Sequence, residues 1–283
     1  MMELHTTLDV EEYARAVIPF LESSPCSRNI LRWIIELARS GTGGWIAPPL
    51  FLWISAGDDV AAAASWSAPY YVIVSEIPNK AATSVVEAVR RHSALHDVPV
   101  LGVSGPRPAA ETTAAAWCVA TGANSREHMA ETLYQVTQVH PVPRPPGERR
   151  KATADDLDVL TRWLIAFAEE TGVPSSPDPA ATLRNMVGRS ECDVWVDGGE
   201  VVSMSGHRAP IAGVTRVGPV YTPPLRRGRG FARRLVAEVS ADALRTTAAR
   251  CMLFADRANP VSNFIYQQIG YEPFEERVDI VFH

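Results

Sequence analysis

A proline-rich segment in the middle of the chain limits which folds the sequence can adopt. The segment "HPVPRPPGERRK", residues 140–151, contains four prolines and a glycine. Proline has no backbone N–H group and a restricted φ angle, so these residues cannot form a helix interior or a central strand. The 283 residues of the chain are enough for two domains of ordinary size, roughly 100 to 200 residues each. We therefore predict two domains, at residues 1–143 and 144–283.

The second half begins with two predicted helices. Residues 153–171 start with Thr153 as an N-cap and Asp156 three residues later, and leucines follow at helical spacing. Residues 178–189 form a shorter helix with Pro179 just inside its start, a position that helices favour for proline.

Strands and helices alternate in the rest of the second half. Two β-rich runs over residues 192–207 are separated by Asp197, Gly198 and Gly199, a sequence typical of a hairpin. The remaining predicted elements are a strand at 213–222, a helix from 231, a strand at 251–255, a helix from 259 that Gly270 ends, and a strand at 277–283. The order from residue 213 to 255 is therefore strand, glycine turn, helix, strand.

The first half repeats this element order without similar residues. Runs at 50–55 and 60–67 flank Gly57, Asp58 and Asp59, and a strand at 70–76, a helix at 80–95, a strand at 98–105 and a helix at 109–122 follow. The turn "SEIPNKAATS" at 75–84 contains no glycine, so we expect no phosphate site there. The pattern indicates an internal duplication. It predicts an α/β chain of two lobes, each a mixed, mostly antiparallel sheet flanked by helices.

Composition excludes several classes of function. The net charge of -5 argues against binding to nucleic acid. No apolar run of about 18 residues could span a membrane, and the first residues lack the apolar core of a secretory signal. The four cysteines, Cys26, Cys118, Cys192 and Cys251, are scattered without ligand spacing, which argues against zinc and disulfides. We expect a cytoplasmic protein with no metal site.

The turn before the predicted helix at 231 has the chemistry of an anion site. Arg226, Arg227 and Arg229 surround Gly228 and Gly230. The first N–H groups of a helix are unpaired and attract phosphate, and glycines let a ligand approach the backbone closely. The glycines are followed by no Lys-Ser/Thr pair and form no G-x-G-x-x-G motif, so nucleotide loops of those kinds are disfavoured.

The hexapeptide from Arg227 to Ala232 fits the pattern Q/R-x-x-G-x-G/A. This pattern opens the long helix of the GCN5-related N-acetyltransferases (GNATs), acyl-CoA-dependent acyltransferases. With "VYTPP" before it and "NPVSNFIYQQIGYEP" after the next strand, the second half resembles this family. The resemblance covers residues 148–283 in element order and is specific over residues 217–274. The first half resembles a degenerate GNAT lobe only in outline.

The resemblance implies a binding mode for acetyl-CoA as cosubstrate. The pyrophosphate would bind the backbone amides of the turn, with Arg227 anchoring the loop. The pantetheine arm would pair like an added strand with the backbone at Val220 and Thr222. The amides concerned would be those of Gly228, Arg229, Gly230, Phe231 and Ala232.

Two residues of the next helix also match the family. Asn259 corresponds to an asparagine that contacts the cofactor, although Asn before Pro260 is also a good helix cap. Tyr266 corresponds to the tyrosine that protonates the leaving thiolate, and a phenol with a pKa of about 10 is a plausible donor to a thiolate of about 8 to 9. A core aromatic before a glycine cap is the alternative for Tyr266.

The general base is less clearly marked. The third strand and the loop before it, residues 207–224, contain no acid. Candidates for the catalytic base are His207, Glu169, Glu170, Asp178 and the terminal carboxylate of His283; a neutral substrate or ordered water could replace a base. Trp163, Phe167 and Trp195 are candidates for lining an acceptor pocket, but the helical spacing of Trp163 and Phe167 is also that of core residues.

These patterns predict an N-acetyltransferase that moves acetyl from acetyl-CoA to a primary amine of a small molecule, by direct transfer in a ternary complex. The absence of a strand acid leaves a non-catalytic acyl-CoA sensor or interaction module as the alternative. A second alternative keeps the enzyme but transfers a longer acyl group, or acts on a protein N-terminus or lysine.

Overall fold

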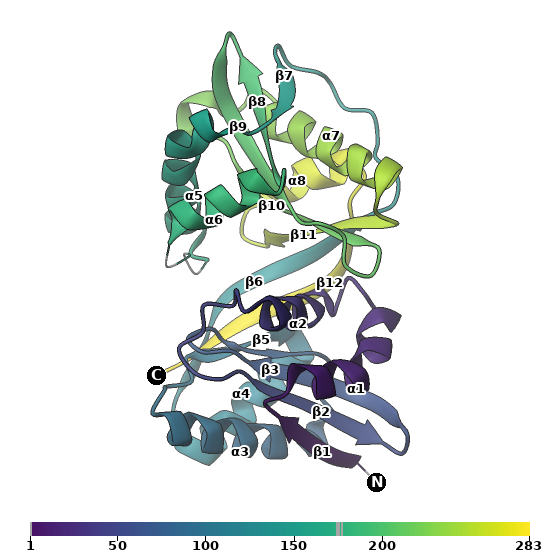
Figure 1. Cartoon of the computed structure of the whole chain (residues 1–283), viewed down its shortest axis with the longest axis vertical. Helices are drawn as coiled ribbons and strands as arrows, with labels where there is room; N and C mark the ends of the chain where they lie inside the picture. The colour runs from purple at the N-terminus through teal and green to yellow at the C-terminus, as the bar shows by residue number, and fades with distance from the viewer. Residues whose placement is uncertain (1, 174–175, 177) are drawn as a thin grey trace. The chain divides into compact units, whose positions relative to one another are not determined.

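The computed structural model describes residues 2–173, 176 and 178–283. The chain divides into two compact units: unit 1 consists of Met1–Leu133 and Glu275–His283, and unit 2 of Tyr134–Phe274. Each unit contains a sheet with helices packed on it (Figure 1). The predicted fold class, α/β lobes with mixed sheets flanked by helices, is confirmed.

In unit 1 the strand order is β1-β2-β3-β4-β5-β12-β6. Strands β4 and β5 run parallel, whereas β1/β2, β2/β3, β3/β4 and β5/β12 are antiparallel. The strands are β1 (Met2–Thr7), β2 (Leu50–Ala56), β3 (Asp59–Trp66), β4 (Val72–Val74), β5 (Gly102–Pro106), β6 (Ser125–Val136) and β12 (Glu272–Phe282). The predicted hairpin at Gly57 is therefore the β2–β3 turn.

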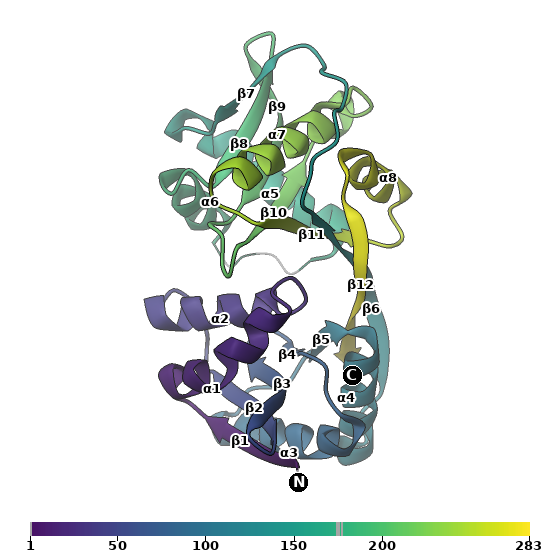
Figure 2. The same cartoon turned by 90° about the vertical axis from the view of Figure 1, so that its right-hand side faces the viewer.

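Four helices pack on the sheet of unit 1 (Figure 2): α1 (Val10–Ser23), α2 (Asn29–Ser40), α3 (Asn79–His96) and α4 (Arg107–Thr121). Alternate residues of β2 point to opposite faces: Leu52 packs in a cluster with α3 and α4, and Phe51 in one with α1 and α2. Helices α1 and α2 were not predicted from the sequence. Asp9 caps α1 by accepting hydrogen bonds from the amides of Glu11 and Glu12.

The sheet of unit 2 repeats this pattern of pairing. Strands β10 and β11 are parallel, and β7/β8, β8/β9 and β9/β10 are antiparallel. The elements are β7 (Glu148–Lys151), α5 (Leu157–Thr171), α6 (Pro179–Gly188), β8 (Cys192–Asp197), β9 (Glu200–His207), β10 (Val214–Tyr221), α7 (Phe231–Thr246), β11 (Arg250–Asp256) and α8 (Pro260–Ile269), with single 3-10 turns at Ala154–Asp156 and Pro224–Arg226. The same order of one parallel pair after antiparallel strands supports the predicted duplication.

The local signals of unit 2 act as predicted. Thr153 and Asp156 form a reciprocal capping box before α5, and Gly198 and Gly199, both with positive φ, form the β8–β9 turn. Val194 packs with α5 and α6, whereas its neighbour Trp195 packs with α7. The sheet is therefore buried on both faces.

The division into units differs from the boundary predicted at residues 143 and 144. The chain passes between units within β6, after Leu133, and again within β12, after Phe274. The last residues of β12 pair with β5, with Arg277 opposite Pro106. The proline-rich segment lies inside unit 2, and its end forms the edge strand β7. Strand pairing between residues far apart in sequence decides this division, and local composition does not reveal it.

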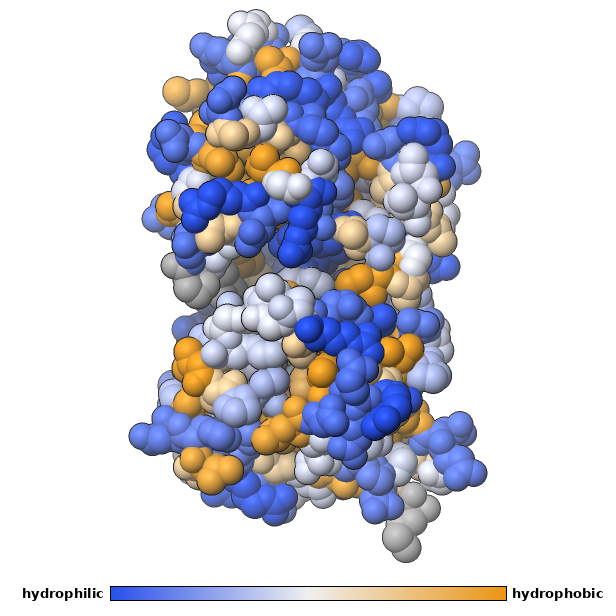
Figure 3. Space-filling model, viewed as in Figure 1, coloured by the Kyte–Doolittle hydropathy of each residue, from blue (hydrophilic) through white to orange (hydrophobic). Residues whose placement is uncertain are grey.

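No helix in the described ranges is long and apolar enough to cross a membrane. Polar residues cover most of the face in Figure 3, and apolar residues form small groups among them.

Candidate functional site

Strand β10 separates from β11 part-way along its length. The two strands pair only from Val214 to Arg216, whereas β10 continues to Tyr221. The pairing of β10 with β9 also shifts register between Val217 and Val220. Beyond Arg216, the edge of β10 that faces β11 has no strand partner among the described residues. Val220, a residue predicted to pair with the pantetheine arm, lies on this open edge. Thr222, the other predicted residue, directly follows the last residue of β10.

The arginine–glycine turn leads from the open edge of β10 into α7. Gly228 and Gly230 have φ angles of 77° and 83°, in the left-handed region that favours glycine. Gly230 is the N-cap of α7, and its carbonyl accepts a hydrogen bond from the amide of Arg234. Within the described ranges, the amides of residues 228–232 have no hydrogen-bond acceptor. These donors are therefore available to an anion, which the helix dipole also attracts.

Arg227 connects the turn to β10 and α5. Its Nε donates to the carbonyl oxygen of Thr222 at 2.8 Å, and its Nη2 donates to Oε2 of Glu170 at 2.6 Å. Its neighbour Arg226 pairs instead with Glu200 at the start of β9. The bond to Thr222 ties the turn to the end of β10, and a role of Arg227 in cofactor binding stays a prediction.

The acid candidate Tyr266 lies on α8 among aromatic rings. The ring centres of Tyr134 and Tyr271 lie 6.3 Å and 6.0 Å from its own. Burial raises the pKa of Tyr266 to about 12. Among the described residues, the Tyr266 hydroxyl has no hydrogen-bond partner. The Tyr266 hydroxyl is therefore protonated at neutral pH and, among the described residues, donates no hydrogen bond to another side chain.

Asn259 is the N-cap of α8, and its side chain accepts a hydrogen bond from the amide of Ser262 at 3.1 Å. The capping role that the sequence offered as an alternative is thus present. The contact of Asn259 with a cofactor stays a prediction.

The base candidate His207 lies in a cluster of charges on β7, β8 and β9. Its Nε2 lies 3.1 Å from Oδ2 of Asp193 and 3.1 Å from Nζ of Lys151. Asp193 is buried and also accepts from Nε of Arg149 at 2.7 Å. Burial opposes its ionisation, but these three partners outweigh it and lower the pKa of Asp193. Among the described residues, no contact joins His207 to Tyr266 or to the turn, so this geometry favours a structural role.

A different candidate base, Glu170, lies next to the turn. Besides Arg227, it accepts a hydrogen bond from the hydroxyl of Tyr221 at 2.9 Å. Partial burial raises the pKa of Glu170, but the bonds from Arg227 and Tyr221 outweigh it, and the pKa lies below its ordinary value. Tyr221 was not predicted as a site residue. Its position at the end of a predicted strand, next to the arginine–glycine turn, could have indicated it.

The candidate pocket aromatics differ in position. Trp195 is fully buried, and its indole Nε1 donates to the carbonyl of Pro146. Trp163 and Phe167 are partly buried against the core between α5 and β8. The ring of Trp163 lies 6.0 Å from that of Tyr221. Trp163 therefore lies beside Tyr221, which bonds to Glu170, whereas Trp195 belongs to the core.

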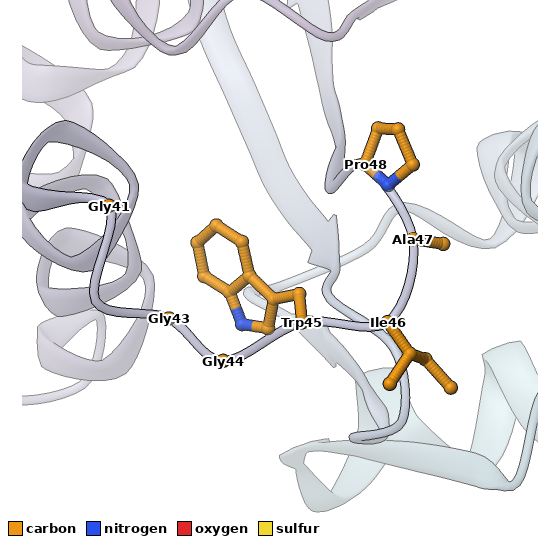
Figure 4. Close-up of a pocket in the computed structure, with 7 residues that line it drawn as sticks. All are labelled: Gly41, Gly43, Gly44, Trp45, Ile46, Ala47 and Pro48. Carbon is orange, nitrogen blue, oxygen red and sulfur yellow. The ribbon is translucent and has the colours of Figure 1, made fainter.

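The structure also contains a pocket in unit 1. It has a volume of about 500 Å³ and is lined by seven residues of the connection between α2 and β2, Gly41, Gly43, Gly44, Trp45, Ile46, Ala47 and Pro48 (Figure 4). It contains none of the predicted site residues. Among the described residues, no three or more His, Cys, Asp or Glu side chains are grouped so that they could hold a metal ion.

Comparisons with known proteins agree with the resemblance seen in the sequence. The model of the family "FR47-like protein" matches residues 198–279, which include the turn. A search of curated proteins finds no match. A GCN5-related N-acetyltransferase from Sphaerobacter thermophilus is 16% identical, with a TM-score of 0.62 and coverage of 100% of this chain and 95% of that one. A GNAT-family acetyltransferase from Colwellia psychrerythraea is 12% identical, with a TM-score of 0.58 and coverage of 99% and 98%. The chain has the GNAT fold.

The tandem form of this fold is also represented. A tandem GNAT protein from the clavulanic acid biosynthesis pathway is 12% identical, with a TM-score of 0.57, and the match covers 100% of this chain and 98% of that one. At these identities the comparisons establish the fold of both units, which is the fold predicted from the sequence.

The turn before α7 combines free hydrogen-bond donors with open space beside its backbone. A Cβ atom at Gly228 would meet nothing within 4 Å, so the space beside the backbone is open. The unpaired amides of residues 228–232 lie in the turn and at the start of α7, and arginines flank them. The groups present therefore fit a phosphate ligand.

Proposed function

We propose that the chain is an acetyl-CoA-dependent N-acetyltransferase that acts on a primary amine of a small molecule, by direct transfer in a ternary complex. One observation carries the proposal: the unpaired amides of residues 228–232 stand at the start of α7, directly after the open edge of β10. A phosphate site next to an unpaired strand edge matches the two ends of a long ligand that has a pyrophosphate and an amide-containing arm. Acetyl-CoA has both and supplies the thioester that the amine attacks.

The chain holds the ligand mainly by its backbone. The amides of the turn bind the pyrophosphate, and the open edge at Val220 and Thr222 pairs with the arm as an added strand would. Because β-addition uses main-chain groups, the side chains there contribute little to recognition. Asn259, at the start of α8, is the predicted further contact.

Tyr266 acts as the proton donor in this proposal. With its pKa at about 12, the hydroxyl keeps its proton across the physiological range. A thiolate has a pKa of about 8 to 9, so complete transfer from the free tyrosine would be uphill by roughly 3 to 4 units, or about 4 to 5 kcal/mol. The hydroxyl therefore serves best as a hydrogen-bond donor to sulfur while negative charge develops there.

The contacts of the two base candidates favour Glu170 over His207. Glu170 is partly exposed and pairs with Arg227 of the turn, whereas His207 lies with Asp193 and Lys151 in the charge cluster of β7, β8 and β9. The carboxylate of Glu170 is ionised at neutral pH and can attract a cationic amine or accept its proton.

The test is acetyl transfer to pooled amines. The protein is incubated with acetyl-CoA and separate pools of aminoglycosides, polyamines, amino acids, arylamines and short peptides, and release of free CoA thiol is followed. Turnover with one pool supports the enzyme, and dividing that pool identifies the acceptor class. Silence with every pool, in protein that binds acetyl-CoA by calorimetry, contradicts the proposed function and favours the acyl-CoA sensor.

A further inference from the structure

Three side chains meet between the C-terminal end of α5 and the turn. The hydroxyl of Tyr221 donates to one carboxylate oxygen of Glu170 at 2.9 Å, and Nη2 of Arg227 donates to the other at 2.6 Å. The guanidinium carbon of Arg227 also lies 5.6 Å from the ring centre of Tyr221. A carboxylate next to an aromatic face is a combination that binds organic cations. Arg227 thus occupies a cation site built from Glu170 and Tyr221.

Arg227 also occupies a position that the ligand needs. Its Nε donates to the carbonyl of Thr222, one of the two residues whose backbone is expected to pair with the pantetheine arm. A pyrophosphate at the turn offers Arg227 more negative charge than one carboxylate does, and bidentate arginine–phosphate pairs are among the stronger hydrogen-bonded pairs. Ligand binding therefore competes with both contacts that now hold the guanidinium.

We infer that Arg227 masks a cation-recognition site, and that acetyl-CoA unmasks it by drawing Arg227 to the pyrophosphate. Glu170 and the face of Tyr221 then recognise the ammonium group of the acceptor. This inference rests on the proposed function and narrows it: the acceptor is an amine that is cationic at neutral pH, and it binds productively after acetyl-CoA.

Arg227 is the charged partner of the Glu170 carboxylate, because the nearby charges pair with one another. On the elements packed against α5, Asp156 pairs with Arg150, and Arg184 lies 4.0 Å from Asp178. Among the described residues, the Glu170 carboxylate accepts hydrogen bonds from Tyr221 and Arg227. When Arg227 turns away, the remaining partner is a neutral hydroxyl, and the full negative charge is available to a ligand.

The first test measures coenzyme A binding by calorimetry in the full chain, with wild type, Glu170→Gln and Glu200→Gln. Glu200 pairs with Arg226 on the same turn, so its substitution is a control for the loss of one negative charge. Half-exposed ion pairs of this kind are weak, and we expect Glu170→Gln to tighten coenzyme A binding about two- to fivefold beyond the control. Equal affinities in the two variants would overturn the inference.

The second test uses the amine pools with the same three proteins. Aminoglycosides and polyamines are cationic at neutral pH, whereas arylamines are neutral. We expect activity with a cationic pool and, in Glu170→Gln, a KM for that amine raised at least tenfold. The control should keep the wild-type KM. Activity with arylamines alone, or a KM unaffected by Glu170→Gln, would overturn the inference and leave the acetyltransferase in place.

The two proposals fail in different ways. Loss of coenzyme A binding in the wild-type protein, or silence with all pools, contradicts the proposed function itself. Normal turnover with equal behaviour of Glu170→Gln and Glu200→Gln contradicts only the masking of Glu170 by Arg227.

Discussion

The phosphate turn can be tested with a pair of glycine substitutions that carry the same backbone strain. Gly230 at the turn has a φ of 83°, and Gly199 in the β8–β9 hairpin has a φ of 84°. A Cβ at Gly199 would meet nothing within 4 Å, and one at Gly230 would meet only the end of the Arg233 side chain, at 3.4 Å. Alanine should therefore be accommodated sterically at both sites, and the cost should come from the left-handed backbone.

The expected stability cost is the same for both variants. A non-glycine residue in the left-handed region costs about 1 to 2 kcal/mol, partly offset by the lower entropy of the unfolded chain. A net loss of about 1 kcal/mol lowers Tm by roughly 2 to 4 °C for a protein of this size class. Thermal melts followed by circular dichroism should show this loss in Gly230→Ala and in Gly199→Ala.

The binding cost should separate the two variants. A methyl group at Gly230 hinders the approach of phosphate to the amides around it. Loss of one hydrogen bond to a charged group costs about 1.5 to 3 kcal/mol, which weakens coenzyme A binding roughly 10- to 150-fold. Calorimetry should show this loss in Gly230→Ala and wild-type affinity in Gly199→Ala. Equal affinity of both variants would refute the assignment of the turn as the phosphate site.

Three further predictions concern single side chains. Tyr266→Phe should lower kcat at least tenfold with little change in KM, and equal effects on kcat and KM would assign the hydroxyl to binding. Because burial raises the pKa of Tyr266 to about 12, kcat of the wild type should show no alkaline loss from this group below about pH 11. Asp193→Asn should cost about 3 kcal/mol in urea unfolding at pH 7, because it removes the buried negative charge that Arg149 and Lys151 both pair with. Since the pKa of Asp193 lies below its ordinary value, its contribution is present above about pH 4 and lost as the pH falls through the lowered pKa, so a cost that does not shrink on acidification would contradict the ion-pair account. Tyr271→Phe should cost about 1 kcal/mol, since its hydroxyl lies 2.8 Å from that of buried Ser240, and unchanged stability would show that this hydrogen bond contributes nothing net.

The turn and the second-half elements could be predicted because their signals are local. A hairpin needs Gly198 and Gly199 at adjacent positions, and a helix cap needs Thr153 and Asp156 three residues apart. The turn proposed to bind phosphate likewise lies within the hexapeptide that ends at Ala232. Each of these motifs is encoded within a few residues, so its structure follows from backbone geometry and hydrogen bonding nearby.

The features that were not predicted depend on residues far apart in the chain. Glu170 and Arg227 are separated by 57 positions, and no local pattern indicates that α5 ends beside the turn. The C-terminal part of β12 pairs with β5, which moves the division of the chain away from the prolines. His207 was a reasonable base candidate by residue type, but its contact with buried Asp193 becomes visible only when β8 and β9 are paired.

The most direct measurement is amide hydrogen exchange of the full chain with and without saturating acetyl-CoA. The account predicts slower exchange in peptides covering residues 217–232, where the open edge of β10 and the turn lie, and little change in the corresponding segment of unit 1, residues 72–84. Protection confined to unit 1, or no protection at residues 217–232 despite measurable binding, would contradict the placement of acetyl-CoA in unit 2.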